Sequence, residues 1–234
     1  MRLLAIEAAT ATVSLALGEG ERVIERDIPQ GQNASEHLTE AIVALLGQAG
    51  CALADLDGLV LGTGPGSLTG LRVAHATAKG LAYALRIPAV GISSLEALAF
   101  DAPAGPAAIV PAIDARRGEL FAGIFTRTAS DLTVHEPALA LSAAALAERC
   151  KDLGQVRVVG PAAALLQPAL DALGAPYEVG APLWPRARAL LHLCPALPAY
   201  DPAALFALEP RYVRAPEAMW STKPKAPRAA PTET

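Results

Sequence analysis

The stretch LVLGTGPGSLTGLRVAHATAKGLAYAL, from Leu59 to Leu85, decides the fold. An apolar run leads into a turn crowded with glycine, and small or apolar side chains then recur at helical spacing. This order predicts a strand, a tight reversal and a long helix, with Ser67 or Thr69 as the helix-capping residue. Free backbone N–H groups at such a helix start can bind an anion.

The glycine turn is therefore a candidate anion- or nucleotide-binding site. Its candidate residues are Gly64, Gly66, Ser67, Thr69 and Gly70. A Walker loop needs Gly-Lys-Ser/Thr, but Lys79 lies deep in the expected helix. The dinucleotide pattern and the Gly-x-Ser-x-Gly elbow both lack glycine at required positions. The turn by itself indicates no standard catalytic chemistry.

Composition limits the class of protein. At 234 residues and 53% hydrophobic content the chain can bury a sizeable core, and its mean hydropathy is +0.35. Much of the apolar content is alanine, and no uncharged run is long enough to span a bilayer. Glu7 follows the start too closely for a signal peptide. We expect a soluble, cytoplasmic protein without membrane contact.

Charge and metal-ligand content exclude further classes. A net charge of -4 gives no overall field for nucleic acid, so RNA contacts must be local or shared with a partner. The three scattered cysteines, Cys51, Cys150 and Cys194, argue against a disulfide framework or a thiolate metal site. No histidine pair has helical metal-ligand spacing, and we expect His37 and His75 at surface or interface positions. We expect no metal, no cofactor and no catalytic residue.

The expected elements occur in the same order twice. The first copy has strands at 2–7, 12–18 and 21–28, a helix at 34–49, a strand at 57–62, a helix at 69–86, a strand at 88–92 and a helix at 93–100. The second has strands at 107–113, 118–126 and 131–136, a helix at 142–151, a strand at 155–159, a helix at 161–173, a strand near 177–179 and a helix at 185–194. This predicts an α/β protein of duplicated β-β-β-α-β-α-β-α lobes with mixed central sheets. The expected domains are an N-terminal lobe at 1–104, a C-terminal lobe at 105–220 and a disordered tail at 221–234.

The helix expected at 69–86 has small residues on two opposite sides. One side carries Ala74, Ala78 and Ala82, and the other carries Ala76, Gly80 and Ala84. Such a helix can pack on its own sheet and also on a helix from another chain. The helix expected at 34–49 has a start like a capping box, with Asn33 and Glu36. The two helices together predict a partner-binding pair.

Two smaller clusters allow a functional or a structural interpretation. Glu7 with Thr10 could present a carboxylate and a hydroxyl to a phosphate or its magnesium ion, or could be a turn with an incidental acid. Arg116 and Arg117, between Asp114 and Glu119, could hold an anion or could fix a hairpin turn by paired charges. For the second cluster the residues favour the structural turn.

Four motifs in this order resemble the TsaB family of bacterial tRNA threonylcarbamoyladenosine biosynthesis proteins. They are IEAAT followed by SLAL, GTGPGSLTGLRVAHATAKGLA, IDARRGELFAGIF, and EPRYVR. The resemblance extends to about Val213 and implies the actin-like ATPase, sugar-kinase and Hsp70 superfold of two related lobes. Two positions depart from the family pattern: the acid-Thr-Ser-Thr turn is Glu7-Ala8-Ala9-Thr10 here, and Leu68 replaces an aromatic residue. The first departure weakens nucleotide binding in the kinase manner.

The resemblance implies an accessory, non-catalytic subunit. Such a subunit binds the catalytic paralogue TsaD and supports the ATPase TsaE in transferring threonylcarbamoyl to N6 of adenosine 37 of tRNAs that read codons beginning with A. The catalytic paralogue holds its metal with a His-x-x-x-His pair, which this sequence lacks. The two first-lobe helices are implied to bind TsaD, or to close into a homodimer when alone, and tRNA is contacted through the complex. The implied interface residues are Leu38, Ala41, Leu45, Leu71, Ala74, His75 and Ala78.

Two enzymatic alternatives use the same residues. An ATP-dependent small-molecule kinase of the same superfold needs a glycine pair in the second lobe, for which Gly160 with Pro161 is a weak candidate. A peptidase needs a base for Ser67, and His75 lies more than two helical turns away. The specific motifs favour the accessory subunit over both.

Overall fold

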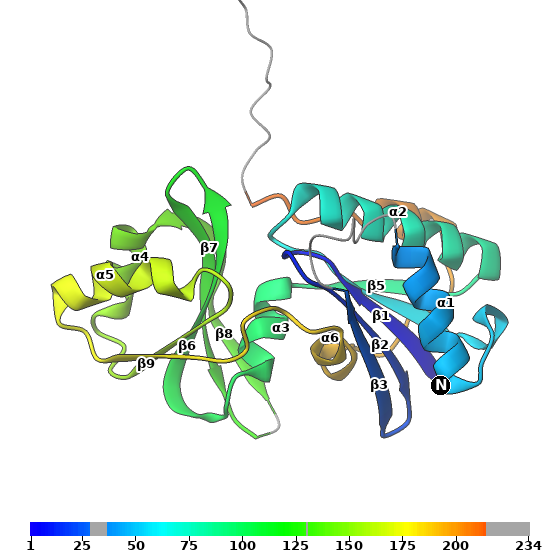
Figure 1. Ribbon diagram of the computed structural model, residues 1–234, viewed down its shortest axis with the longest axis horizontal. Helices are drawn as coiled ribbons and strands as arrows, with labels where there is room; N and C mark the ends of the chain where they lie inside the picture. Colours follow the sequence, from blue (N-terminus) through cyan, green and yellow to red (C-terminus); the bar gives the residue numbers. More distant parts are fainter. Residues whose placement is uncertain (29–36, 130, 214–234) are drawn as a thin grey trace, which may run out of the picture.

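The computed structural model of the protein describes residues 1–28, 37–129 and 131–213. It has two lobes, each built on a five-stranded mixed sheet (Figure 1). The strands of the first sheet are β1 (Arg2–Glu7), β2 (Val13–Glu19), β3 (Arg22–Ile28), β4 (Gly58–Gly62) and β5 (Ala89–Ile92). Their order across the sheet is β3-β2-β1-β4-β5, with β1 antiparallel to β2 and parallel to β4.

The second sheet repeats this topology. Its strands are β6 (Gly105–Arg116), β7 (Glu119–Arg127), β8 (Leu132–Ser142), β9 (Val156–Val159) and β10 (Tyr177–Gly180). The order is β10-β9-β6-β7-β8, and β6 is antiparallel to β7 and parallel to β9. Given in the opposite direction, this order is β8-β7-β6-β9-β10, so β6 takes the place of β1, β7 that of β2, and so on across the sheet. The expected α/β fold with duplicated mixed sheets is confirmed.

Helices connect and cover the strands. They are α1 (Leu38–Ala49), α2 (Leu68–Leu85), α3 (Ser94–Asp101), α4 (Ala143–Cys150), α5 (Ala163–Leu173), α6 (Ala187–Leu193) and α7 (Pro202–Ala207), with a short 3-10 turn, η1 (Leu53–Asp55). Helices α1 and α2 lie on one face of the first sheet, and α4 and α5 lie together on the second lobe (Figure 1). Most ends agree with the expected ends within one to three residues.

Local signals explain how α1 forms and where it ends. Its buried residues recur at helical spacing and pack on the apolar side chains of the first sheet. Gly50 ends the helix in a left-handed conformation with φ 70°, and its N–H donates to the Gly47 carbonyl at 3.1 Å. The capping box expected at Asn33 and Glu36 lies outside the described residues.

Helices α3 and α6 are exchanged between the lobes. Helix α3 follows the first sheet along the chain but packs on β6, β7 and β8, and α6 follows the second sheet but packs on β1, β2 and β4. The two helices also contact each other between the sheets (Figure 1), where the Arg188 Nε donates to Asp101 Oδ1 at 3.2 Å. Each lobe thus supplies part of the other's core.

This exchange changes the expected division of the chain. The second sheet begins at Gly105, but α6 and residues 202–213 return to the first lobe, so the range 105–220 is not one spatial unit. Helix α7, which packs on α2, was missed. Its start signal was readable, because Asp201 caps the helix and Pro202 occupies its first turn. The tail expected at 221–234 lies outside the described residues.

The remaining composition-based expectations can be checked on the described residues. No helix among them is long and apolar enough to cross a membrane. All three cysteines are free thiols; Cys150 is buried, and Cys51 and Cys194 are half-buried.

Candidate functional site

The glycine turn packs closely on the backbone of the turn between β1 and β2. The Ser67 N–H donates to the Ala9 carbonyl at 2.7 Å. A Cβ on Gly66 would lie 2.1 Å from the Ala9 carbonyl oxygen, and one on Gly70 would lie 2.3 Å from the Ala8 carbonyl oxygen. Since no side chain tolerates such distances, glycine is required at both positions by packing within the chain.

Three backbone N–H groups of the turn, those of Gly64, Ser67 and Gly70, have partners in the chain. Ser67 caps α2, as expected, because its Oγ accepts from the Gly70 N–H at 3.3 Å. The Gly64 N–H donates to Ser94 Oγ at 3.1 Å, and Gly64 itself has φ +88°. These bonds use N–H groups that a phosphate loop would turn toward its ligand. The glycine content of this turn therefore reflects close packing.

Glu7 is turned into the protein. Its side chain is 0% exposed; Oε1 accepts from the Ala9 N–H and Oε2 from the Ser94 hydroxyl, both at 2.7 Å. A Cβ on Gly62 would lie 2.0 Å from Oε2, so glycine there makes room for the carboxyl. Burial raises the pKa of the Glu7 carboxyl from 4.5 to about 7, against the opposing effect of the hydrogen bonds. A carboxyl that is fully buried and bonded within the chain favours the structural interpretation over the phosphate or magnesium interpretation.

A cleft of about 520 Å³ opens between the two lobes beside this turn. Gly66, Ser67 and Thr69 of the candidate anion site line it, whereas Gly64 and Gly70 do not. Its lining residues are Ala9, Thr10, Ala11, Gly66, Ser67, Leu68, Thr69, Ile113, Asp114, Ala115, Arg116, Phe121 and Pro161. The glycine turn and the β6–β7 hairpin thus meet across one cleft.

Paired charges fix the tip of the β6–β7 hairpin, in agreement with the structural interpretation that the sequence favoured for this cluster. Asp114 Oδ1 accepts from the Arg116 N–H at 2.7 Å, and Asp114 Oδ2 lies 3.3 Å from the Arg116 guanidinium. Arg116 and Arg117 both have left-handed backbone, with φ 65° and 58°. The turn that carries these arginines therefore needs Asp114 as its anchor.

Ser67 and His75 do not form a nucleophile pair. Ser67 Oγ accepts the N–H of Gly70, and His75 is 3% exposed, with Nδ1 2.9 Å from the Leu71 carbonyl oxygen. Burial lowers the pKa of His75, which favours the neutral ring. His75 is therefore a core residue, contrary to the expected surface or interface position, while His37 is exposed beside Glu40.

All seven residues proposed for the partner interface lie in the chain's own core. Their exposed fractions range from 0% for Leu45 and Ala78 to 6% for Ala41. The set is Leu38, Ala41, Leu45, Leu71, Ala74, His75 and Ala78. They fill the space between the helices and the first sheet, so a second chain cannot contact them directly. Any surface that α1 and α2 offer a partner is formed by their opposite sides.

The sides of α1 and α2 that face away from the sheet carry small residues and some apolar side chains, as the spacing of small residues predicts. On α2, Ala76 and Gly80 are exposed, and a Cβ on Gly80 would meet open space. Val43 on α1 and Tyr83 on α2 are 57% and 56% exposed. We call Val43, Ala76, Gly80 and Tyr83 the outer helix face.

The returning C-terminal segment braces α2. Lys79 Nζ donates to the Phe206 carbonyl at 3.0 Å and to Glu209 Oε1 at 2.6 Å. The Tyr83 and Phe206 rings lie 5.6 Å apart. Arg211 joins the segment to the end of β4, because its N–H donates to the Thr63 carbonyl at 2.7 Å. Sequence reasoning missed these contacts, which link residues more than a hundred positions apart.

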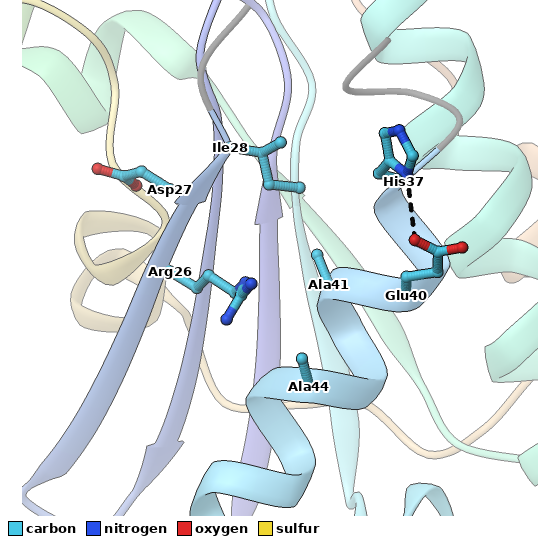
Figure 2. Close-up of a pocket in the computed structure, with 7 residues that line it drawn as sticks. All are labelled: Arg26, Asp27, Ile28, His37, Glu40, Ala41 and Ala44. Atoms are coloured by element: carbon cyan, nitrogen blue, oxygen red, sulfur yellow. Dashed lines mark hydrogen bonds and ion pairs between the residues drawn. The ribbon is translucent and has the colours of Figure 1, made fainter. Parts of the chain in front are cut away.

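A second cavity, of about 460 Å³, lies between β3 and α1 (Figure 2). Arg26 points toward α1, Asp27 lies on the far side of β3, and the His37 ring is 3.0 Å from Glu40 Oε2 (Figure 2). The lining residues are Arg26, Asp27, Ile28, His37, Glu40, Ala41 and Ala44. These side chains converge on no common point. Over the ranges that the structure describes, no group of His, Cys, Asp and Glu side chains could hold a metal ion.

Comparison with known proteins assigns the chain to a family. The model of the family described as TsaD: tRNA N6-adenosine threonylcarbamoyltransferase matches residues 29–153, just over half of the chain. The chain belongs to this TsaD family. The matched range contains α1, α2, the glycine turn and the β6–β7 hairpin.

Within the TsaD family, the chain is similar to proteins named TsaB. It is 37% identical over 126 residues to the tRNA threonylcarbamoyladenosine biosynthesis protein TsaB of Bacillus subtilis, covering 53% of the chain and 55% of the relative. The Escherichia coli TsaB is 34% identical over 123 residues, covering 52% and 53%. The chain spans about half the length of the curated relatives it matches. The expected resemblance to TsaB is confirmed.

A solved structure confirms the fold over most of the chain. A Pseudomonas aeruginosa protein, described as uncharacterized with similarity to peptidase YEAZ, superposes with a TM-score of 0.76 at 25% identity. The match covers 91% of this chain and 99% of that one.

Proposed function

We propose that the chain is an accessory, non-catalytic subunit in the biosynthesis of threonylcarbamoyladenosine in tRNA. One observation carries this: the glycine turn packs closely on the chain's own backbone, and the nearby acid, Glu7, is buried. The TsaB names of its relatives support the same pathway. In this proposal the chain binds the catalytic subunit TsaD, supports the ATPase TsaE, and meets tRNA through the complex.

The outer helix face is the proposed docking surface for TsaD. Exposed apolar side chains on it, Val43 and Tyr83, flank small residues that allow close approach of a partner helix. The family model spans both helices, so the catalytic subunit carries a homologous pair that can pack on this face with pseudo-twofold symmetry. In the absence of TsaD, the same face can close on a second copy.

Reconstitution tests the proposed role. The chain is mixed with TsaD and TsaE from the same source, and co-elution and threonylcarbamoyl transfer to tRNA are measured with and without it. We expect a stable complex and transfer that depends on the chain. Transfer at the same rate without the chain would overturn the accessory role.

Matched surface variants test the docking face. Val43→Glu and Tyr83→Glu place a charge on the outer helix face, and Leu165→Glu places one on α5 at a similar exposure of 56%. We expect at least about tenfold weaker TsaD binding for the first two, because each leaves an unpaired charge in a desolvated contact. Equal binding by all three variants would exclude this face.

A small-molecule kinase is the second candidate function, because the interlobe cleft is present. It requires ATP turnover by the chain alone with a small alcohol. Phosphoryl transfer needs donors and a metal held around the phosphates, whereas the N–H groups of Gly64, Ser67 and Gly70 are engaged within the chain. ATP turnover that survives purification would favour the kinase.

A further inference from the structure

The mouth of the interlobe cleft brings together basic and aromatic side chains from three separated segments. Arg116 of the β6–β7 hairpin lines the cleft, and Arg72 follows the lining residues Leu68 and Thr69 by one turn of α2. The Arg211 N–H bond to Thr63 holds the last described residues beside the same turn. In Figure 1 the hairpin tip, the start of α2 and this segment lie at the same end of the gap between the lobes.

The arginines at the mouth project into solvent. The Arg116 side chain is 86% exposed, and Arg72 and Arg211 are also exposed. Two nearby acids are already engaged, since Asp114 anchors the tip through Arg116 and Glu209 pairs with Lys79 at 2.6 Å. The half-buried Glu96 interacts electrostatically with Arg211. A chain of net charge -4 thus keeps a local group of guanidinium ions at one opening.

The hairpin tip holds Arg116 in an unfavourable backbone conformation. Arg116, Arg117 and Gly118 are consecutive left-handed residues, and only glycine adopts that region without cost. Residues with strained backbone concentrate at functional sites. Two arginines in such a turn are therefore consistent with a hairpin tip whose function is to expose positive charge.

An aromatic ring accompanies these charges. Tyr212 is 46% exposed, and its hydroxyl accepts from Arg72 Nε at 3.5 Å. Exposed rings beside arginines suit unpaired nucleotides, whose bases stack while their phosphates meet the guanidinium groups.

We infer that the cleft mouth, defined by Arg72, Arg116, Arg211 and Tyr212, binds an unpaired loop of RNA directly. The three arginines contact phosphates, and the Tyr212 ring stacks on a base. This inference rests on the proposed function, which makes tRNA the RNA concerned, and extends it by giving the accessory subunit its own contact with the substrate.

Fluorescence anisotropy of the purified full-length chain tests this surface. The probes are a fluorescein-labelled RNA hairpin with an unpaired loop and a fully paired duplex of the same length. The triple variant Arg72→Gln/Arg116→Gln/Arg211→Gln removes the mouth charges. The control Arg22→Gln/Arg26→Gln/Arg149→Gln removes three exposed arginines from β3 and α4, so the change in net charge is the same.

We expect the mouth variant to bind the hairpin about tenfold or more weakly than the wild type. For this variant the slope of log K against log salt concentration becomes shallower by about 0.7 for each lost contact between a phosphate and a guanidinium ion. Three lost contacts change the slope by about 2. The control variant keeps the wild-type affinity for the hairpin. Tyr212→Phe retains binding, whereas Tyr212→Leu weakens it about tenfold because leucine offers no ring for a base to stack on.

Several results would overturn the inference. They are equally weakened hairpin binding in the mouth and control variants, no salt-dependent binding by the wild type, or equal affinity for the hairpin and the duplex. Co-elution with TsaD is measured on the same samples. A mouth variant that co-elutes normally and binds RNA like the wild type would refute the RNA site alone, while a wild type that neither binds nor assists TsaD would refute the proposed function.

Discussion

Glu7 allows a quantitative prediction about the pH dependence of stability. Its carboxyl is 0% exposed, and burial raises its pKa from 4.5 to about 7. A folded state with the higher pKa binds the proton more tightly than the unfolded chain does. The contribution to stability is therefore fully present below about pH 4.5 and is lost as pH rises through 7. At about 1.4 kcal/mol per pKa unit, the loss is about 3 kcal/mol.

Glu7→Gln tests this reasoning because glutamine keeps the shape and an acceptor for the Ala9 N–H but cannot ionise. We expect the difference in unfolding free energy, variant minus wild type, to increase by about 2.5 kcal/mol between pH 5 and pH 8.5, because a small part of the effect has already been lost at pH 5. The assay is urea unfolding followed by circular dichroism across that range. Using the difference cancels groups common to both proteins, His75 among them.

The matched control is Glu21→Gln, since Glu21 is exposed on the turn between β2 and β3. Its difference from the wild type is expected to stay nearly constant with pH. If Glu7→Gln shows the same flat difference, the buried carboxyl does not carry the proton linkage and the reasoning fails.

Three further substitutions test the packing. Ala78→Arg is expected to destabilise the chain by more than about 4 kcal/mol in thermal or urea unfolding, because the site is 0% exposed. A folded monomer of unchanged stability would contradict the burial. Gly66→Ala is expected to cost about 2 kcal/mol or more because its Cβ would lie 2.1 Å from the Ala9 carbonyl oxygen. Gly80→Ala meets open space on α2 and is expected to stabilise by up to about 1 kcal/mol, so the opposite ranking would be inconsistent with this packing.

Some features of the candidate site follow from neighbouring residues in the sequence, and others depend on contacts between distant segments. Ser67 was identified as the cap of α2 because capping depends on neighbouring residues alone. The role of Gly66 was not visible, since the Ala9 carbonyl that excludes its side chain comes from a distant turn. The orientation of Glu7 depends in the same way on Ser94, which lies 87 positions along the chain.

Sequence by itself determined the duplicated order of strands and helices, the glycine turn and the family resemblance. These follow from local signals, namely apolar periodicity, caps and turn residues, which act over a few positions. Only the tertiary structure decided which side of α2 is buried, because small residues repeat on two opposite sides and only one of them packs on the sheet. It also decided that α3 and α6 exchange lobes, since that depends on how two sheets separated along the chain bury their remaining faces together.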